Sequence, residues 1–118
     1  MKVNGLLVAG LVLASSLANA HMKVAKTAPA EGETLSEAPE FVQVWFSQKP
    51  DEAMSKLVLT GPEGDVSLFV HPADENSLMG MVQEEKLAGG DYVVKWQAAG
   101  DDGHIQKGEF KFTIEAHQ

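Results

Sequence analysis

The most regular stretch of the sequence reads DYVVKWQ from Asp91 to Gln97, and a second one reads EFKFTI from Glu109 to Ile114. Apolar residues occupy every second position, namely Tyr92, Val94 and Trp96 in the first stretch and Phe110, Phe112 and Ile114 in the second. Period-two alternation places one set of side chains in a core and the other set in water. We therefore predict two half-buried β-strands.

Shorter apolar runs extend this pattern toward the N-terminus: Phe41–Phe46, Lys56–Thr60, Val66–Val70 and the weaker Leu78–Val82. Turn-forming residues separate them, and helical periodicity is scarce, so the pattern indicates a β-sandwich or barrel. The residues Leu87, Gly90 and Tyr92 have the spacing of the tyrosine corner found in Greek-key sandwiches. We interpret the segment from Ala28 to Glu33 as a loop and the side chains of Trp45 and Trp96 as core anchors.

The first 20 residues have the form of a secretory signal. Lys2 supplies a positive start, the stretch from Leu6 to Leu17 is apolar, and Ala18-Asn19-Ala20 matches an A-x-A cleavage site. The apolar run is shorter than the ~20 residues of a membrane span and lacks a basic flank, which argues against an anchor. We predict a cleaved signal peptide over 1–20 and a single domain over 21–118.

The net charge and the absence of cysteine exclude several classes of binding partner and metal ligand. The net charge is −8, and losing Lys2 makes it −9. Such an acidic domain is unsuited to nucleic acid or to an anionic membrane surface. The sequence has no cysteine, so the core alone must hold an exported fold, and any metal must be bound by His, carboxylate, Met or main-chain nitrogen.

Two places could supply metal donors. Cleavage after Ala20 would give His21 a free α-amine beside its imidazole, and the two nitrogens can chelate one ion in the tetragonal N/O geometry that Cu(II) prefers. In an extended segment, Asp102 and His104 would point to the same side. Each place has a plainer explanation, because signal peptidase can expose a His by accident and Gly100–Gly103 can be merely an acidic turn.

In combination these residues resemble the CopC family of periplasmic copper-resistance proteins. The resemblance covers essentially all of 21–118, through the matching segments His21–Lys23, Ala28–Gly32, Val44–Ser47, Gly90–Trp96 and Asp102–His104 followed by Gly108 to Phe112. It implies an Ig-like sandwich or barrel, all-β, with about seven strands. It also implies that one Cu(II) ion is held by the amine and imidazole of His21 together with Asp102 and His104.

Some positions depart from the family pattern. Gln48 stands where some relatives have a Glu near the copper, and the segment 57–65 lacks the methionines with which some relatives bind Cu(I). We therefore expect a member that binds only Cu(II). Met79 and Met81 flank Gly80 and could offer thioethers to Cu(I), but core packing is the commoner role of methionine. His71, before Pro72, is interpreted as a surface loop residue.

The sequence thus predicts a periplasmic copper carrier or buffer, monomeric and without membrane insertion after cleavage. Its partners would be the copper ion and a membrane copper transporter or another periplasmic copper protein. No catalytic motif is present, so we expect no enzyme activity. Two alternatives remain open, a copper oxidase with a histidine brace and a metal-free Ig-like interaction module.

Overall fold

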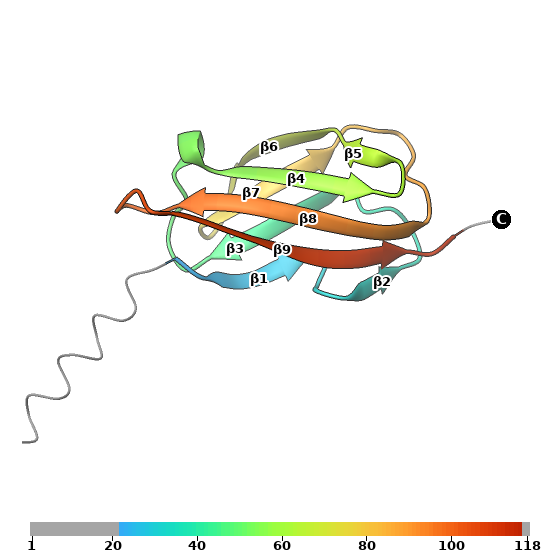
Figure 1. Cartoon of the computed structure of the whole chain (residues 1–118), viewed down its shortest axis with the longest axis horizontal. Coiled ribbons are helices and arrows are strands. Elements are labelled where there is room, and N and C mark those ends of the chain that lie inside the picture. Colours follow the sequence, from blue (N-terminus) through green and yellow to red (C-terminus); the bar gives the residue numbers. More distant parts are fainter. Residues whose placement is uncertain (1–21, 117–118) are drawn as a thin grey trace, which may run out of the picture.

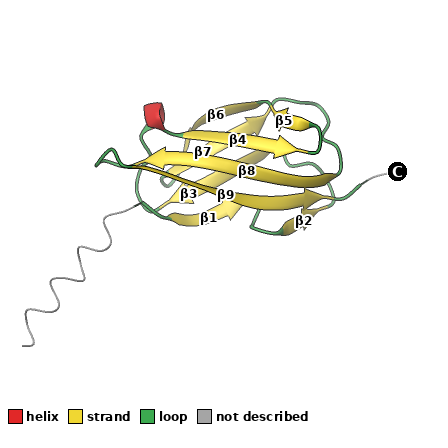
Figure 2. Cartoon of the chain, viewed as in Figure 1, coloured by secondary structure: helices red, strands yellow, loops and turns green. Residues whose placement is uncertain are grey.

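Strands are the main secondary structure of the described residues, as the alternating side chains predict. The computed structural model describes residues 22–116 (Figures 1 and 2). Those residues form one short 3-10 helix, η3 (Glu52–Met54), and nine strands: β1 (Val24–Ala28), β2 (Glu33–Leu35), β3 (Phe41–Phe46), β4 (Lys56–Gly61), β5 (Gly64–Val66), β6 (Leu68–Ala73), β7 (Ser77–Val82), β8 (Gly90–Ala99) and β9 (Ile105–Ile114).

The strands form two sheets that face each other (Figure 1). One sheet has the order β1-β3-β7-β6 and the other β2-β9-β8-β4-β5. β2 runs parallel to β9, whereas the other neighbouring strands are antiparallel. The prediction of an all-β Greek-key sandwich is confirmed.

The core lies between the sheets and consists of the inward side chains that the alternation predicts. β8 and β9 contribute Tyr92, Val94, Phe110, Phe112 and Ile114, and the facing strands contribute Val42, Val44, Phe46 and Leu78. The Phe46 and Trp96 rings meet edge to face across the core, with centroids 5.3 Å apart. Trp96 is partly buried and packs against this core, as the sequence predicts.

A tyrosine corner closes the end of the sandwich at which β8 begins. The Tyr92 side chain is 2% exposed, and its hydroxyl donates a 2.6 Å hydrogen bond to the carbonyl oxygen of Ala88. Burial, reinforced by the charges of Glu63 and Glu84, raises the pKa of Tyr92 above its usual value. The sequence-based interpretation of this corner is confirmed.

Five expectations need correction. The segment predicted as a loop up to Glu33 contributes its two ends to β1 and β2, and with the short β5 the strands number nine instead of about seven. His71 lies within β6, not in a loop.

Two of the corrections concern the core. Trp45 lies on the outer face of its sheet, and the ammonium of Lys26 lies over its ring, 4.5 Å from the centroid. The inward positions of β3 are taken by Val42, Val44 and Phe46. Met79 and Met81 lie outside the core cluster.

Among residues 22–116, no helix has the length and apolar character that crossing a membrane requires.

Candidate metal centre

The β8–β9 hairpin carries the predicted donors at its tip. The two strands pair from Gly90↔Ile114 to Ala99↔Ile105, which leaves residues 100–104 as the connecting loop. The loop turns through a 3.0 Å hydrogen bond from the backbone N–H of Gly103 to the carbonyl of Gly100. Gly103 has φ = +75°, a conformation that favours glycine. The acidic turn that the sequence allows at Gly100–Gly103 is therefore present.

Asp102 and His104 meet within this loop. One carboxylate oxygen of Asp102 accepts a 3.0 Å hydrogen bond from the backbone N–H of His104, and the other lies 3.2 Å from His104 Nδ1. The two side chains are 48% and 72% exposed, respectively. The sequence predicted that the pair would converge, but for a different reason. Gly103 is not extended, and the turn together with the Asp102 side chain brings the two groups together.

The spacing of this pair suits two donors on one metal ion. For metal–donor bonds of about 2.0–2.1 Å, two donors at a right angle stand about 2.9 Å apart. The Oδ2 of Asp102 and the Nδ1 of His104 are 3.2 Å apart, so little movement is needed. A metal must displace the proton that otherwise joins them.

The beginning of the described chain is fixed beside this hairpin. Met22 is 4% exposed and belongs to the core. The side-chain amide of Gln106 spans the Met22 backbone: in the amide orientation that satisfies both groups, its nitrogen donates to the Met22 carbonyl at 2.9 Å, and its oxygen accepts from the Met22 N–H at 3.2 Å. Gln106 is two residues from His104, so the chain enters the fold next to the Asp102–His104 pair. The predicted ligand His21 lies outside the described residues.

Gln106 is a residue that the sequence analysis missed. Its only signal is its position on β9 two residues after His104, and nothing in the sequence indicates a contact with residue 22. Lys23 adds a second attachment, since its N–H donates to the hydroxyl of Ser47 at 2.9 Å and its carbonyl accepts from the Ser47 N–H at 2.8 Å.

Gln48 also lies at this end. A Cβ added at Gly100 would collide with the Gln48 side chain and would lie 3.4 Å from Met22 Cε. The position considered for a further ligand is therefore adjacent to the hairpin but carries an amide. Within residues 22–116, no group of three or more His, Asp or Glu side chains is placed to hold a metal.

An acidic hollow adjoins the hairpin. It measures about 510 Å³ and is bordered by η3, by the segment before it and by the hairpin loop, and its ionisable residues are Lys49, Asp51, Glu52 and Asp101. Three carboxylates against one ammonium favour the approach of cations to this end of the molecule.

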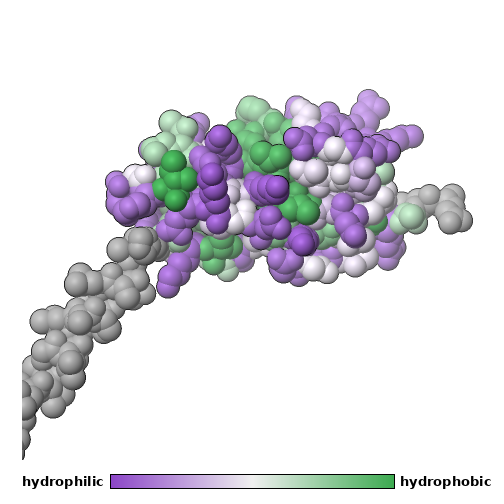
Figure 3. Space-filling model, viewed as in Figure 1, coloured by the Kyte–Doolittle hydropathy of each residue, from purple (hydrophilic) through white to green (hydrophobic). Residues whose placement is uncertain are grey.

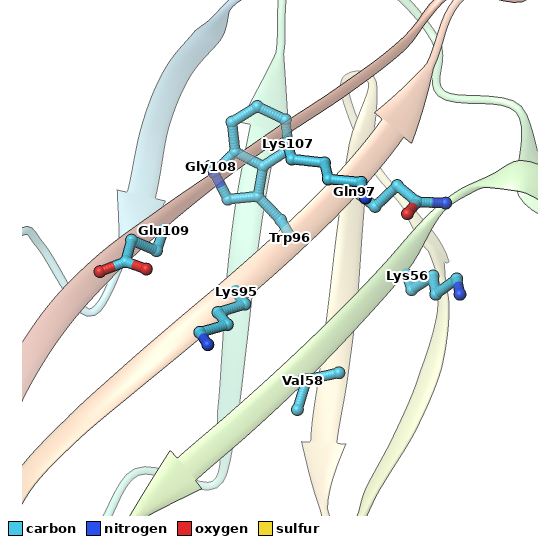
Figure 4. A pocket seen from close by; sticks show the side chains of 8 residues that line it. All are labelled: Lys56, Val58, Lys95, Trp96, Gln97, Lys107, Gly108 and Glu109. Atoms are coloured by element: carbon cyan, nitrogen blue, oxygen red, sulfur yellow. The ribbon is translucent and has the colours of Figure 1, made fainter.

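A second hollow, of about 430 Å³, lies on the outer face of β4, β8 and β9 (Figure 4). Three lysines border it, Lys56, Lys95 and Lys107, and Glu109 supplies the carboxylate. Figure 3 shows this side of the molecule, where hydrophilic side chains alternate with smaller apolar patches. The lysine-bordered hollow does not have the donor set of a metal site.

Residues 24–115 match the CopC domain family. The chain belongs to the CopC family. Copper resistance protein C from Escherichia coli is 30% identical to it, over 92% of this chain and 94% of the relative. The protein of the same name from Pseudomonas syringae pv. tomato is 31% identical, over 87% of each chain.

Two solved CopC-family structures share the fold. PcoC from Escherichia coli, described as a methionine-rich copper resistance protein, has a TM-score of 0.73 and 30% identity, with coverage of 81% of this chain and 100% of PcoC. CopC from Methylosinus trichosporium OB3b has a TM-score of 0.72 and 25% identity, with coverage of 83% and 97%. The resemblance inferred from sequence motifs is therefore confirmed.

Proposed function

We propose that this CopC-family protein binds one Cu(II) ion at the tip of the β8–β9 hairpin and serves in copper resistance or homeostasis. The observation that carries the proposal is the approach of Asp102 to His104, with 3.2 Å between two donor atoms on an exposed loop. The copper-resistance names of the relatives support the choice of metal.

The remaining donors would come from the processed N-terminus. Cleavage of residues 1–20 leaves His21 as the first residue, with an amine and an imidazole for one chelate. Gln106 holds the backbone of Met22 two residues from His104, so the described chain begins beside the pair, and the proposal assigns the remaining donors to the residue before Met22. Three nitrogens and one carboxylate oxygen make a set that favours tetragonal Cu(II).

The bound ion is cargo in this proposal. The donors are exposed at one end of the fold, and the acidic hollow beside them attracts cations, which suits a carrier or buffer. The protein would act in the periplasm and exchange copper with a membrane transporter or another periplasmic copper protein. Since amine and imidazole donors must be deprotonated, Cu(II) affinity should fall as the pH is lowered.

The decisive experiment is calorimetric titration of Cu(II) into tag-free protein that begins at His21. A variant with one Ala added before His21 keeps the imidazole but loses the chelate, and its affinity should fall at least about tenfold. The matched control adds one Ala after Gln118 and should bind as the parent does. Equal affinity in all three proteins would refute the role of the terminal amine.

The same preparation tests the metal-free alternative. A ligand that binds only the folded state raises the melting temperature by mass action. Equimolar Cu(II) should therefore raise the melting temperature of the parent protein. An unchanged melting temperature would favour an interaction module without metal.

A further inference from the structure

The outer face of the four-stranded sheet holds two methionines that the core does not use. A Cβ added at Gly80 would lie 2.9 Å from Leu68 Cδ1 and 3.5 Å from Leu57 Cδ1, so position 80 points into the core. Neighbouring positions on a strand point the opposite way. Met79 and Met81 therefore both project outward from β7, where each is half-buried.

The strand register brings an imidazole to the same place. His71 of β6 is directly opposite Met79, and Phe69 is directly opposite Met81. Directly opposite residues have Cβ atoms about 4.5–5.5 Å apart, and diagonal ones about 7–8 Å. The rings of Phe69 and His71 lie 5.4 Å apart, as expected for one face. One imidazole and two flexible thioethers thus occupy neighbouring positions on one face of the sheet, within reach of a common ion.

The hydrogen bonding of His71 favours a ligand role. Its Nδ1 lies 2.9 Å from the carbonyl oxygen of Pro72, and a carbonyl can only accept, so Nδ1 carries the proton. In the neutral ring, Nε2 then holds the lone pair. Histidines that bind metals commonly donate their other ring N–H to a carbonyl in this way, which fixes the tautomer.

The surroundings select the kind of ion. On the other side of Met79 lies Gln43, whose amide already donates to the Ser77 hydroxyl at 2.8 Å in a buried bond. Phe41 lies opposite Met81 on β3, so aromatic residues flank Met81 on both sides. These rows contain no carboxylate, so a hard divalent cation would find no anionic oxygen there. Thioether and imidazole ligands instead suit Cu(I).

We propose that Met79, Met81 and His71 form a second metal site, specific for a soft monovalent cation such as Cu(I), on the outer face of the four-stranded sheet. This site shares no residue with the hairpin tip and does not depend on the proposed Cu(II) function. It makes the chain a carrier for both oxidation states of copper, in contrast to the expectation of Cu(II) binding alone.

The location is tested by NMR of the mature protein with ¹³C-methyl methionine, titrated with Ag(I) as a redox-inert probe. Four methionines follow residue 20: Met22, Met54, Met79 and Met81. One equivalent of Ag(I) should shift the methyl resonances of Met79 and Met81 and leave those of Met22 and Met54 in place. Unmoved Met79 and Met81 resonances would overturn the proposal.

The affinity is tested by anaerobic competition for Cu(I) against a bathocuproine chelator. Met79→Leu combined with Met81→Leu keeps the side-chain volume but removes both sulfurs, and Cu(I) affinity should fall at least about tenfold. Met54→Leu, in η3, is the matched control and should bind as the parent does. Equal Cu(I) affinity in the parent and the double variant would refute the site. If the double variant does not fold, the methyl resonances of the parent decide.

Discussion

The hairpin tip and the outer face of the four-stranded sheet present metal donors in opposite ways. At the tip, Asp102 and His104 are exposed on a turn that contains Gly103, and they offer a carboxylate oxygen and an imidazole nitrogen. On the sheet, Met79 and Met81 are half-buried on a paired strand and offer sulfur. In the two proposals, one small sandwich would separate hard from soft ions by placing different donors on a loop and on a strand. Three variants test how independent the two places are.

The largest expected effect comes from removing both tip side chains, Asp102→Ala with His104→Ala. Two of the four proposed donors are lost, so Cu(II) affinity should fall at least about 100-fold, or about 2.7 kcal/mol. Ag(I) affinity should stay unchanged. Calorimetry with each ion measures both. Asp101→Ala is the control, since it removes a carboxylate of the same turn without removing a proposed donor.

An equal loss of Cu(II) and Ag(I) affinity in the Asp102/His104 variant would mean that the two places are one site or that the fold is damaged. Full Cu(II) affinity would remove the hairpin tip from the copper site.

A smaller effect is expected for Gly103→Ala. An added Cβ meets nothing within 4 Å, so the cost comes from the backbone at φ = +75° and should be about 1–2 kcal/mol of unfolding free energy. Because this turn positions Asp102 and His104, Cu(II) affinity should fall as well. Urea unfolding and calorimetry provide the two measurements.

Gly32→Ala is a close match for this test, since Gly32 has φ = +79° and also has no atom within 4 Å of an added Cβ. It should lose similar stability and keep its Cu(II) affinity. If Gly103→Ala and Gly32→Ala lower the Cu(II) affinity equally, general destabilisation explains the result, and the turn at Gly103 has no special role.

The smallest effect concerns the tyrosine corner, at the opposite end of β8 from the tip. Tyr92→Phe removes the hydrogen bond to Ala88 and should lower the unfolding free energy by about 1 kcal/mol at neutral pH. Both metal affinities should remain as in the parent. A change in either would show that the two ends are coupled.

The same variant has a distinct alkaline behaviour. The raised pKa of Tyr92 means that its contribution to stability is present below the unfolded pKa of about 10 and is lost as the pH rises through the higher folded pKa. Urea unfolding between neutral and strongly alkaline pH should therefore show a fall in stability that Tyr92→Phe reduces. An identical alkaline fall in the variant would assign it to other groups.

Alternation predicted the strands but not always which face a residue takes. Tyr92, Val94 and Phe112 are buried as expected, because both long strands obey one period. Trp45, Met79 and Met81 were assigned to the core on residue type, and the structure places all three on the outer face. The register of β3 and β7, fixed by the inward Val44 and Leu78, outweighs the preference of a large apolar side chain for the interior.

The sequence predicted the part of the candidate site whose residues lie close together along the chain. Asp102 and His104 are two apart, so a local argument sufficed to bring them together. Gln106 and Met22 are far apart in the sequence, and their contact depends on how the sheets pack. No local sequence pattern could therefore predict it. The proximity of His71 to Met79 and Met81 could not be predicted either, because it depends on the pairing register of β6 with β7.

The ladder between β8 and β9 joins ten pairs of residues and ends at the tip proposed to bind Cu(II). A loop mounted on so long a hairpin would hold its two proposed donors in place before an ion binds, so little ordering entropy would be lost on binding. In the proposed carrier role, transfer of copper to another protein would require no unfolding of either sheet. The rate of exchange would be set by bond-by-bond replacement of ligands at an accessible corner, where an incoming donor can attach before the outgoing one has left.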